Sequence, residues 1–262
     1  MEQILISDNL YQYHFPKPEK QDYLDPHITI FQQEDQAVLL DCGFESQGLA
    51  LKNTLDAQGI AVQQVLLSHF HPDHYEGYHS FEGLPLYASN QYHRFYAFRK
   101  NTEPDSYLPL VQHELSHDDQ LAFGEWNFRF HEKPGHSPCT LVTQINQSIF
   151  HIGDLVLVND QGKLSLPYVV EGGDVPAYLE SLDWLERLDF DIVLLSHGFP
   201  IRERAIFRSL IQRITYYLES IWKPRGKAVL EDCILGEPED YIYHRFHKMN
   251  CQQIRKNFPK KP

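Results

Sequence analysis

Short apolar runs recur along the first 200 residues, and each has the length of a buried strand. Several end in glycine, proline or aspartate, which are common in turns. Residues 140–145 and 148–152 flank Asn146-Gln147 and predict a hairpin. We expect strands at residues 3–6, 27–31, 36–43, 65–67, 84–88, 121–123, 126–131, 140–145, 148–152 and 191–195.

Helices are predicted where apolar side chains recur every three or four residues. This spacing indicates a helix over residues 47–58 that ends near Gly59. Further helices are expected over 90–100, which is rich in aromatic side chains, and over 175–188, with Pro176 in the first turn. Residues 101–119 are polar and are expected to be irregular. Strands that alternate with helices favour a layered α/β fold.

Beyond residue 200 the pattern becomes mostly helical. Ile206, Leu210, Ile211, Ile214, Leu218 and Ile221 form one apolar stripe. We interpret the stripe either as core or as a subunit contact, and the second interpretation predicts a homodimer through the C-terminal helices. No clear linker divides the chain. The expected organisation is a domain over residues 1–200 with a helical extension over 201–262 packed on it.

Composition restricts the classes of partner. Hydrophobic residues make up 42% of the 262 residues and charged residues 23%, as in ordinary globular proteins. No run approaches the roughly 18 apolar residues of a membrane span. A formal charge of -13 argues against nucleic acid and anionic membranes as general partners. We therefore expect a small-molecule substrate.

The N-terminus has neither the basic start nor the apolar core of a secretion signal. The four cysteines are scattered and form no Cys-x-x-Cys pair. Free thiols in a reducing compartment are the better interpretation, so we expect a cytoplasmic protein.

A cluster of metal-binding residue types follows the expected strand at 65–67. His69, His71, Asp73 and His74 bring three imidazoles and one carboxylate together within six residues. Neutral imidazole and carboxylate are the usual ligands of divalent metal ions. The chain has 15 histidines, so chance pairs are expected, but the full pattern is far more specific than any two of its members.

Three more residues of these types each follow an expected strand. His136 stands in Pro-Gly-His, Asp154 in Gly-Asp and His197 in Ser-His-Gly. Each alone is weak evidence for a metal site, since a histidine in a Pro-Gly turn has a structural role more often than a metal-binding one. Taken together they are informative, because ligands at strand ends can converge on one edge of a sheet.

In chain order, His-x-His-x-Asp-His, Pro-Gly-His, Gly-Asp and Ser-His-Gly resemble the motifs of the metallo-β-lactamase superfamily over about residues 25–200. The resemblance implies a four-layered αβ/βα sandwich of the α/β class with two divalent metal ions at one edge of the paired sheets. Zinc is the expected metal, with iron and manganese as alternatives. The implied ligands are His69, His71 and His136 for the first ion, Asp73, His74 and His197 for the second, and Asp154 as the bridge.

The resemblance also assigns residues around the ligands. Asp41 matches an aspartate that the family places beneath the site, where it orients imidazoles. Cys42 stands where the family commonly has threonine or serine, and Cys139 where it has glycine. Each cysteine is interpreted either as an inert small residue or as a thiol close enough to the metals to contribute.

By the same resemblance we expect a hydrolase similar to hydroxyacylglutathione hydrolases and lactonases. It would use a metal-bridging hydroxide to cleave an ester, thioester or lactone, with Asp73 as the catalytic residue that orients water or passes a proton. Tyr168 is the candidate for substrate contact, by a loose match to some lactonases. Two alternatives are a mononuclear iron oxidoreductase of the sulfur dioxygenase type and a metal-binding regulatory protein of the same fold.

Other sequence features give weaker evidence for a catalytic or binding site. The chain has neither a Gly-x-Ser-x-Gly elbow nor a phosphate-binding Gly-x-x-x-x-Gly-Lys loop. Gly172-Gly173-Asp174 is better interpreted as a turn with Asp174 at a helix N-cap than as a phosphate site. The aromatic helix over 90–100 is interpreted either as a roof for the substrate pocket or as an ordinary packed helix.

Overall fold

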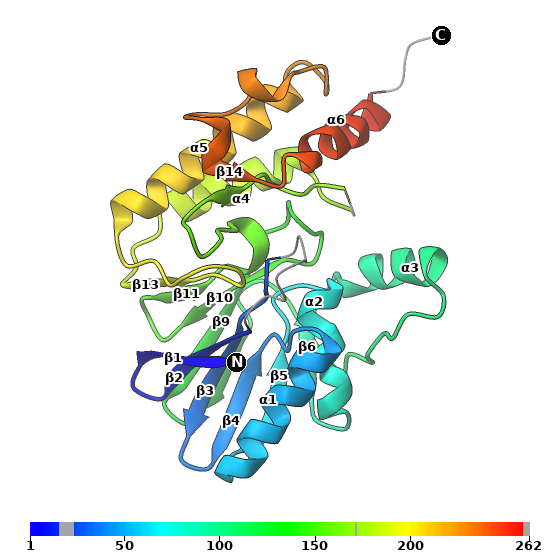
Figure 1. The fold of residues 1–262 in the computed structure, drawn as a ribbon. Coiled ribbons are helices and arrows are strands. Elements are labelled where there is room, and N and C mark those ends of the chain that lie inside the picture. The colour runs from blue at the N-terminus through cyan, green and yellow to red at the C-terminus, as the bar shows by residue number, and fades with distance from the viewer. Residues whose placement is uncertain (16–23, 171, 259–262) are drawn as a thin grey trace.

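Two β-sheets lie face to face in the computed structural model, which describes residues 1–15, 24–170 and 172–258 (Figure 1). The first sheet has its strands in chain order, antiparallel from β1 to β4 and parallel from β4 to β7. These strands are β1 (Glu2–Ser7), β2 (Leu10–His14), β3 (Ile28–Gln33), β4 (Gln36–Leu40), β5 (Ala61–Leu66), β6 (Leu86–Ser89) and β7 (His113–Leu115).

The second sheet has the order β13-β11-β10-β9-β8, and only its β11–β13 pair is parallel. Its strands are β8 (Gln120–Phe123), β9 (Trp126–Glu132), β10 (Leu141–Ile145), β11 (Ile149–His151) and β13 (Ile192–Leu194). A small parallel pair of β12 (Leu164–Ser165) and β14 (Tyr241–Ile242) lies outside both sheets.

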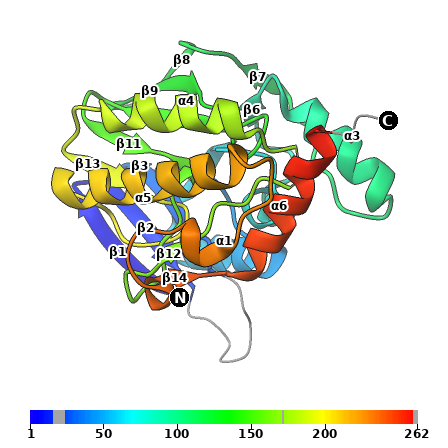
Figure 2. The same cartoon turned by 90° about the horizontal axis from the view of Figure 1, so that it is seen from above.

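Helices cover the outer face of each sheet, as the two views show (Figures 1 and 2). The first sheet is covered by α1 (Glu45–Gln58), α2 (Pro72–Tyr75), η1 (Glu76–Phe81) and α3 (Tyr92–Thr102). The second carries α4 (Val175–Glu186) and α5 (Arg204–Trp222), and α6 (Arg245–Asn257) lies beside α5, farther from the sheet. Short 3-10 helices complete the described chain: η2 (Gly153–Leu155), η3 (Leu230–Asp232) and η4 (Pro238–Asp240).

Three separate hydrophobic clusters fill the spaces between the four layers. On β4, Val38 and Leu40 point into the cluster between the sheets, whereas Leu39 points into the cluster under α1 and α3. On β10, Leu141 points between the sheets and Val142 points toward α4 and α5. This period-two alternation is what a strand buried on both faces requires. The predicted four-layered αβ/βα sandwich is confirmed.

The element predictions are confirmed for the long strands and helices. Helix α1 ends at Gly59, which adopts a left-handed conformation with φ 71°. Helix α4 begins at Asp174, whose carboxylate accepts from the backbone N–H of Ala177 at 2.8 Å, with Pro176 in the first turn. The hairpin of β10 and β11 forms around Asn146-Gln147 as predicted.

Residues 101–119 are not irregular throughout, and that prediction was wrong for β7. This edge strand has only Leu115 buried, while His113 and Glu114 are exposed, so no apolar alternation signals it. Strand β2 was missed because it buries the polar side chain of Gln12. Strand β5 begins four residues earlier than predicted, since its first residues are largely exposed.

The apolar stripe of α5 is core. All its members are buried except Ile206, which is 48% exposed, and they pack in one cluster with α4. The predicted homodimer stays a prediction, as does the boundary at residue 200. Residues 259–262 of the predicted extension lie outside the described residues. In the described chain, no helix combines the length and the apolar character needed to cross a membrane.

Candidate metal centre

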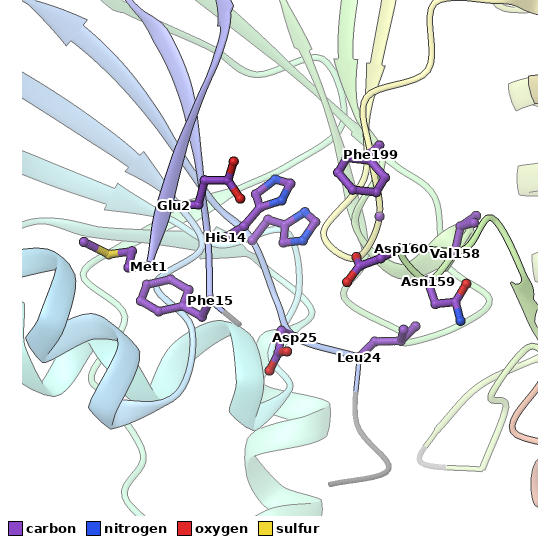
Figure 3. Close-up of a pocket in the computed structure, with 12 residues that line it drawn as sticks. Met1, Glu2, His14, Phe15, Leu24, Asp25, Val158, Asn159, Asp160 and Phe199 are labelled. Carbon is purple, nitrogen blue, oxygen red and sulfur yellow. The ribbon is translucent and has the colours of Figure 1, made fainter. Parts of the chain in front are cut away.

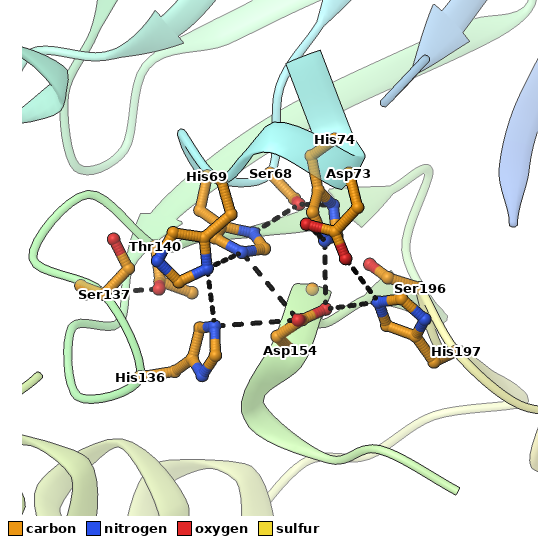
Figure 4. A network of polar contacts seen from close by, with 12 residues as sticks. Ser68, His69, Asp73, His74, His136, Ser137, Thr140, Asp154, Ser196 and His197 are labelled. Carbon is orange, nitrogen blue, oxygen red and sulfur yellow. Dashed lines mark hydrogen bonds and ion pairs between the residues drawn. The ribbon is translucent and has the colours of Figure 1, made fainter. Parts of the chain in front are cut away.

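The predicted ligands meet at one edge of the two sheets, where β5, β11 and β13 end (Figure 4). His69 and His71 follow β5, and Asp73 and His74 stand in the first turns of α2. The other three lie in turns: His136 between β9 and β10, Asp154 in η2 and His197 after β13.

The first group consists of His69, His71, His136 and Asp154, all buried. Nδ1 of His71 lies 3.0 Å from Nε2 of His69 and 3.0 Å from Nε2 of His136. Oδ2 of Asp154 lies 3.8 Å from Nε2 of His69 and 3.6 Å from Nε2 of His136. The ligand atoms all fall within 4.8 Å of one another, which suits a single ion.

The second group consists of Asp73, His74, His197 and again Asp154. Nε2 of His74 lies 3.3 Å from Oδ1 of Asp154 and 3.7 Å from Oδ1 of Asp73. Nε2 of His197 lies 3.5 Å from both carboxylates. Asp154 therefore presents a different carboxylate oxygen to each group.

Buried hydrogen bonds determine which ring nitrogens face the cluster. Nδ1 of His74 donates to Oδ2 of Asp41 at 2.8 Å, because a carboxylate can only accept. The Ser68 hydroxyl donates to the same oxygen at 2.7 Å, which leaves its own oxygen to accept from Nδ1 of His69 at 3.1 Å. Asp41 thus fixes the tautomer of His74 directly and that of His69 through Ser68. In both rings Nε2 is therefore the nitrogen that faces the ligand group and can bind a metal ion.

This arrangement of side chains fits metal ions. Nε2 of His69 and Nε2 of His74 both face the Asp154 carboxylate in a buried space, at 3.8 and 3.3 Å. Burial opposes ionisation of His74, but the carboxylates of Asp154 and Asp41 raise its pKa well above its ordinary value, so this space requires positive charge. Protons supply that charge in the metal-free chain, and divalent ions can replace them. The two groups therefore fit a dinuclear metal site.

The two groups differ in charge. Burial lowers the pKa of His71 to about 3 and also lowers the pKa of His136, so the first group is rich in neutral imidazole. In the second group burial opposes ionisation of His197, but Asp154 and Asp73 outweigh it and raise its pKa to about 9. The carboxylates of Asp73 and Asp154 thus stabilise positive charge in this group, which protons supply in the metal-free chain and which the second ion would supply when bound.

The cysteines are packed beside the centre without joining either group of ligands. The Cys42 thiol donates to the backbone carbonyl of His74 at 3.0 Å, and the Cys139 sulfur accepts from the backbone N–H of Phe70 at 3.3 Å. Burial raises the pKa of both thiols. These contacts favour the interpretation as inert small residues. All four cysteines are free, while the cytoplasmic location stays a prediction.

Helix α4 fixes two of the ligand-bearing turns through Tyr178. The buried Tyr178 hydroxyl reaches two backbone carbonyls, that of Asp154 at 3.2 Å and that of Leu155 at 2.9 Å. A Cβ on Gly135 would lie only 2.3 Å from Cα of Tyr178, so the turn before His136 packs directly on the helix. Tyr178 lies on the apolar face of the helix that was predicted over residues 175–188, and the helical spacing gives no sign of this role.

Replacing Tyr178 by phenylalanine should lower the free energy of unfolding by about 1–2 kcal/mol, because two buried carbonyls lose their donor. Urea denaturation measures this change. Tyr216→Phe is the matched control: its half-exposed hydroxyl donates to the Asp232 carbonyl at 3.4 Å, and we expect a loss below about 0.5 kcal/mol. Equal losses in the two variants would contradict the role given to Tyr178.

A cavity of about 920 Å³ lies over the ligand groups and includes Asp73 in its wall. Tyr168 lines it, with its ring 6.4 Å from that of His136 and 4.9 Å from that of Phe246 on α6, while its contact with a substrate stays a prediction. Both interpretations of α3 hold in part. Its Arg99 lines the cavity and its Phe95 ring lies 4.6 Å from that of His71, whereas its tyrosines pack near Phe70.

Several residues around the candidate site were not predicted from the sequence. Ser68 directly precedes His69, and a hydroxyl beside a proposed metal ligand could have indicated a hydrogen bond to its imidazole. Tyr243, Phe246 and Met249 line the cavity from the C-terminal segment, more than 160 residues after Pro72. No local pattern connects them to the metal ligands, so only the fold could reveal them.

Comparison with known proteins agrees with this geometry. The family model of the metallo-β-lactamase superfamily matches residues 23–197. A beta-lactamase-like protein 2 homolog of Drosophila melanogaster is 26% identical over 188 residues, which cover 69% of this chain and 59% of the relative. A hydroxyacylglutathione hydrolase of Xanthomonas oryzae pv. oryzae is 23% identical over 177 residues, 66% of this chain and 60% of the relative. The match thus spans about three fifths of these curated relatives.

Solved structures share the fold at low sequence identity. A metallo-beta-lactamase from Pontibacter korlensis has a TM-score of 0.64 at 20% identity, over 80% of this chain and 98% of its own. A beta-lactamase domain protein from Burkholderia ambifaria also has a TM-score of 0.64 at 20% identity, over 87% of this chain and 80% of its own. The chain therefore belongs to the metallo-β-lactamase superfamily.

Proposed function

We propose that this protein is an enzyme, a dinuclear metal hydrolase that cleaves an ester, thioester or lactone of a small molecule. The observation that carries the proposal is the shared carboxylate of Asp154, which joins two complete ligand groups under one cavity. His69, His71 and His136 would hold one ion, and Asp73, His74 and His197 the other. Mixed imidazole and carboxylate donors suit zinc, with iron and manganese as alternatives.

Two bound divalent ions supply a hydroxide nucleophile at neutral pH and stabilise negative charge on a carbonyl oxygen. The chain's own contribution centres on Asp73, whose side chain is 26% exposed where the other ligand side chains are nearly buried. From the cavity wall its carboxylate can accept a hydrogen bond from an attacking water and take up its proton. We therefore propose Asp73 as the catalytic residue.

The walls of the cavity support a substrate with an apolar portion. Tyr168, Phe246 and Met249 form one side of it, and we propose that Tyr168 contacts the substrate. A thioester is one of the supported classes, since one relative is named a hydroxyacylglutathione hydrolase. Two complete ligand groups favour two ions over the single iron of a sulfur dioxygenase-type enzyme.

Metal analysis and a substrate panel test the proposal together. We expect about two divalent ions per chain by elemental analysis, and turnover of at least one member of an ester, thioester and lactone panel. A chelator should abolish turnover, and zinc, iron or manganese should restore it. One iron per chain with oxygen consumption on a persulfide would instead support the oxidoreductase. Two tightly bound ions without turnover of any panel member would support the regulatory alternative.

A further inference from the structure

A second cavity, of about 300 Å³, lies beside the metal cavity, and we call it the side cavity. Glu2, His14 and Phe15 lie on one side of it, and Asn159, Asp160 and Phe199 on the other (Figure 3). The two cavities share Phe15, Leu24 and Asp25 in their walls. They therefore adjoin, although none of the proposed metal ligands lines the side cavity.

Two stacked imidazoles form part of its wall. The rings of His14 and His27 are nearly parallel, at 8°, with centroids 3.4 Å apart. His27 is only 4% exposed. Its Nδ1 and the Nε2 of His14 are buried and have no hydrogen-bond partner among the described residues. A native structure rarely leaves two such nitrogens unpaired, so they point to a ligand with polar hydrogen-bonding groups.

The charges around the cavity favour a cation. Burial lowers the pKa of His14 to about 4 and that of His27 to about 2, so both rings are neutral at pH 7. The carboxylates of Glu2 and Asp160 lie at the exposed rim, and no lysine or arginine is among the lining residues that the structure describes. The Phe199 ring lies 5.7 Å from that of His14 and adds an aromatic face, which attracts organic cations.

The geometry suits an organic ammonium better than a metal ion. Neither His14 nor His27 belongs to any group of three ligand atoms within 4.8 Å in the described part of the chain. A primary ammonium, by contrast, has three N–H donors and no acceptor. Those donors match the unpaired ring nitrogens and the carboxylate of Asp160. A quaternary ammonium has the same charge but no N–H to donate.

We propose that the side cavity binds the primary ammonium group of a small organic molecule, between the stacked His14–His27 pair and Asp160. Because the cavities adjoin, one molecule can place its ammonium here and its scissile bond over the metal centre. This extension to substrate selection rests on the proposed hydrolase function, whereas the binding itself does not.

Ligand-observed NMR on the full chain in its metal-loaded form tests the proposal with three probes. Propylammonium should bind with a dissociation constant in the millimolar range, as expected for so small a ligand. 1-Propanol lacks the charge and tetramethylammonium lacks the donors, so each should bind at least about tenfold more weakly. Equal binding of the three probes, or no binding of propylammonium, would overturn the proposal. Binding is read without turnover, so a failure of the proposed hydrolysis leaves this outcome intact.

Two variants and one control locate the site. Asp160→Asn removes the rim charge, and His14→Phe keeps a stacked ring while removing Nε2. Each should weaken propylammonium binding at least about fivefold, because each removes one partner of the ammonium. Asp8→Asn removes an exposed carboxylate outside the cavity and should leave binding unchanged. Unfolding midpoints check that each variant folds. Wild-type binding in folded Asp160→Asn and His14→Phe would overturn the proposal.

Discussion

Replacing Asp154 by asparagine should deplete both bound metal ions and lower kcat/KM by roughly a thousandfold. The carboxylate presents one oxygen to each ligand group, and it is the only described residue that belongs to both. Asparagine has nearly the same shape but no charge, and its amide N–H₂ would point at one of the two ions. A loss of several kcal/mol of transition-state stabilisation corresponds to a factor of this size.

Elemental analysis and steady-state kinetics on the best panel substrate measure the two effects of Asp154→Asn. Asp105→Asn is the matched control, since Asp105 is exposed and lies in neither ligand group. It should retain both ions and full activity. Far-UV circular dichroism checks that the Asp154 variant is folded. A folded Asp154→Asn protein with two ions and activity within threefold of wild type would contradict the bridging role.

The candidate metal ligands could be picked out from the sequence because each of them belongs to a local pattern. Four of them fall within residues 69–74, and His136, Asp154 and His197 each follow a strand that hydrophobicity alone reveals. The alternation of Val38, Leu39 and Leu40 between two clusters likewise follows from the strand repeat. The structure adds that the seven side chains converge in two groups that share Asp154.

The substrate side of the centre could not be predicted in the same way. Phe246 on α6 and Arg99 on α3 line the cavity because of how their helices pack in the fold. The apolar spacing of a helix indicates which of its faces is buried, but not which distant residues that face contacts. The His14–His27 stack joins β2 to the segment before β3, and His27 was assigned simply to a strand. Contacts between residues far apart in the sequence do not produce a periodic pattern of apolar residues, so they cannot be predicted from such a pattern.

The hydrogen bonds beneath the candidate metal centre could be predicted from the sequence only in part. Asp41 was anticipated from a family resemblance, but the role of Ser68 was not. Asp41 has φ 62°, a left-handed conformation that aspartate and asparagine tolerate better than most residues. The turn after β4 thereby directs its carboxylate at Ser68 and His74 rather than at solvent. Asparagine should fit this backbone equally well, which makes Asp41→Asn a clean test.

Asp41→Asn should weaken binding of the second metal ion and turnover by roughly 10–100-fold, although every proposed ligand remains. The asparagine amide can donate to Nδ1 of His74, which would move the ring proton to Nε2 and remove the lone pair that faces Asp73 and Asp154. Stepwise metal titration of the apo-protein separates the two ions. Unchanged affinities for both ions would contradict the tautomer argument.

A pair of substitutions at Ser68 distinguishes tautomer control from a general loss of packing. Ser68→Ala removes the hydroxyl that accepts from Nδ1 of His69, whereas Ser68→Thr keeps it. Alanine should therefore weaken mainly the first ion, held by His69, and threonine should restore its affinity. A purely structural role would lower both affinities together and give threonine, the bulkier residue, the larger defect. The affinity for the first metal ion is therefore compared between Ser68→Ala and Ser68→Thr. A higher affinity in the threonine variant would show that Asp41 acts on the first ion through Ser68, and a lower one would show a role in packing alone.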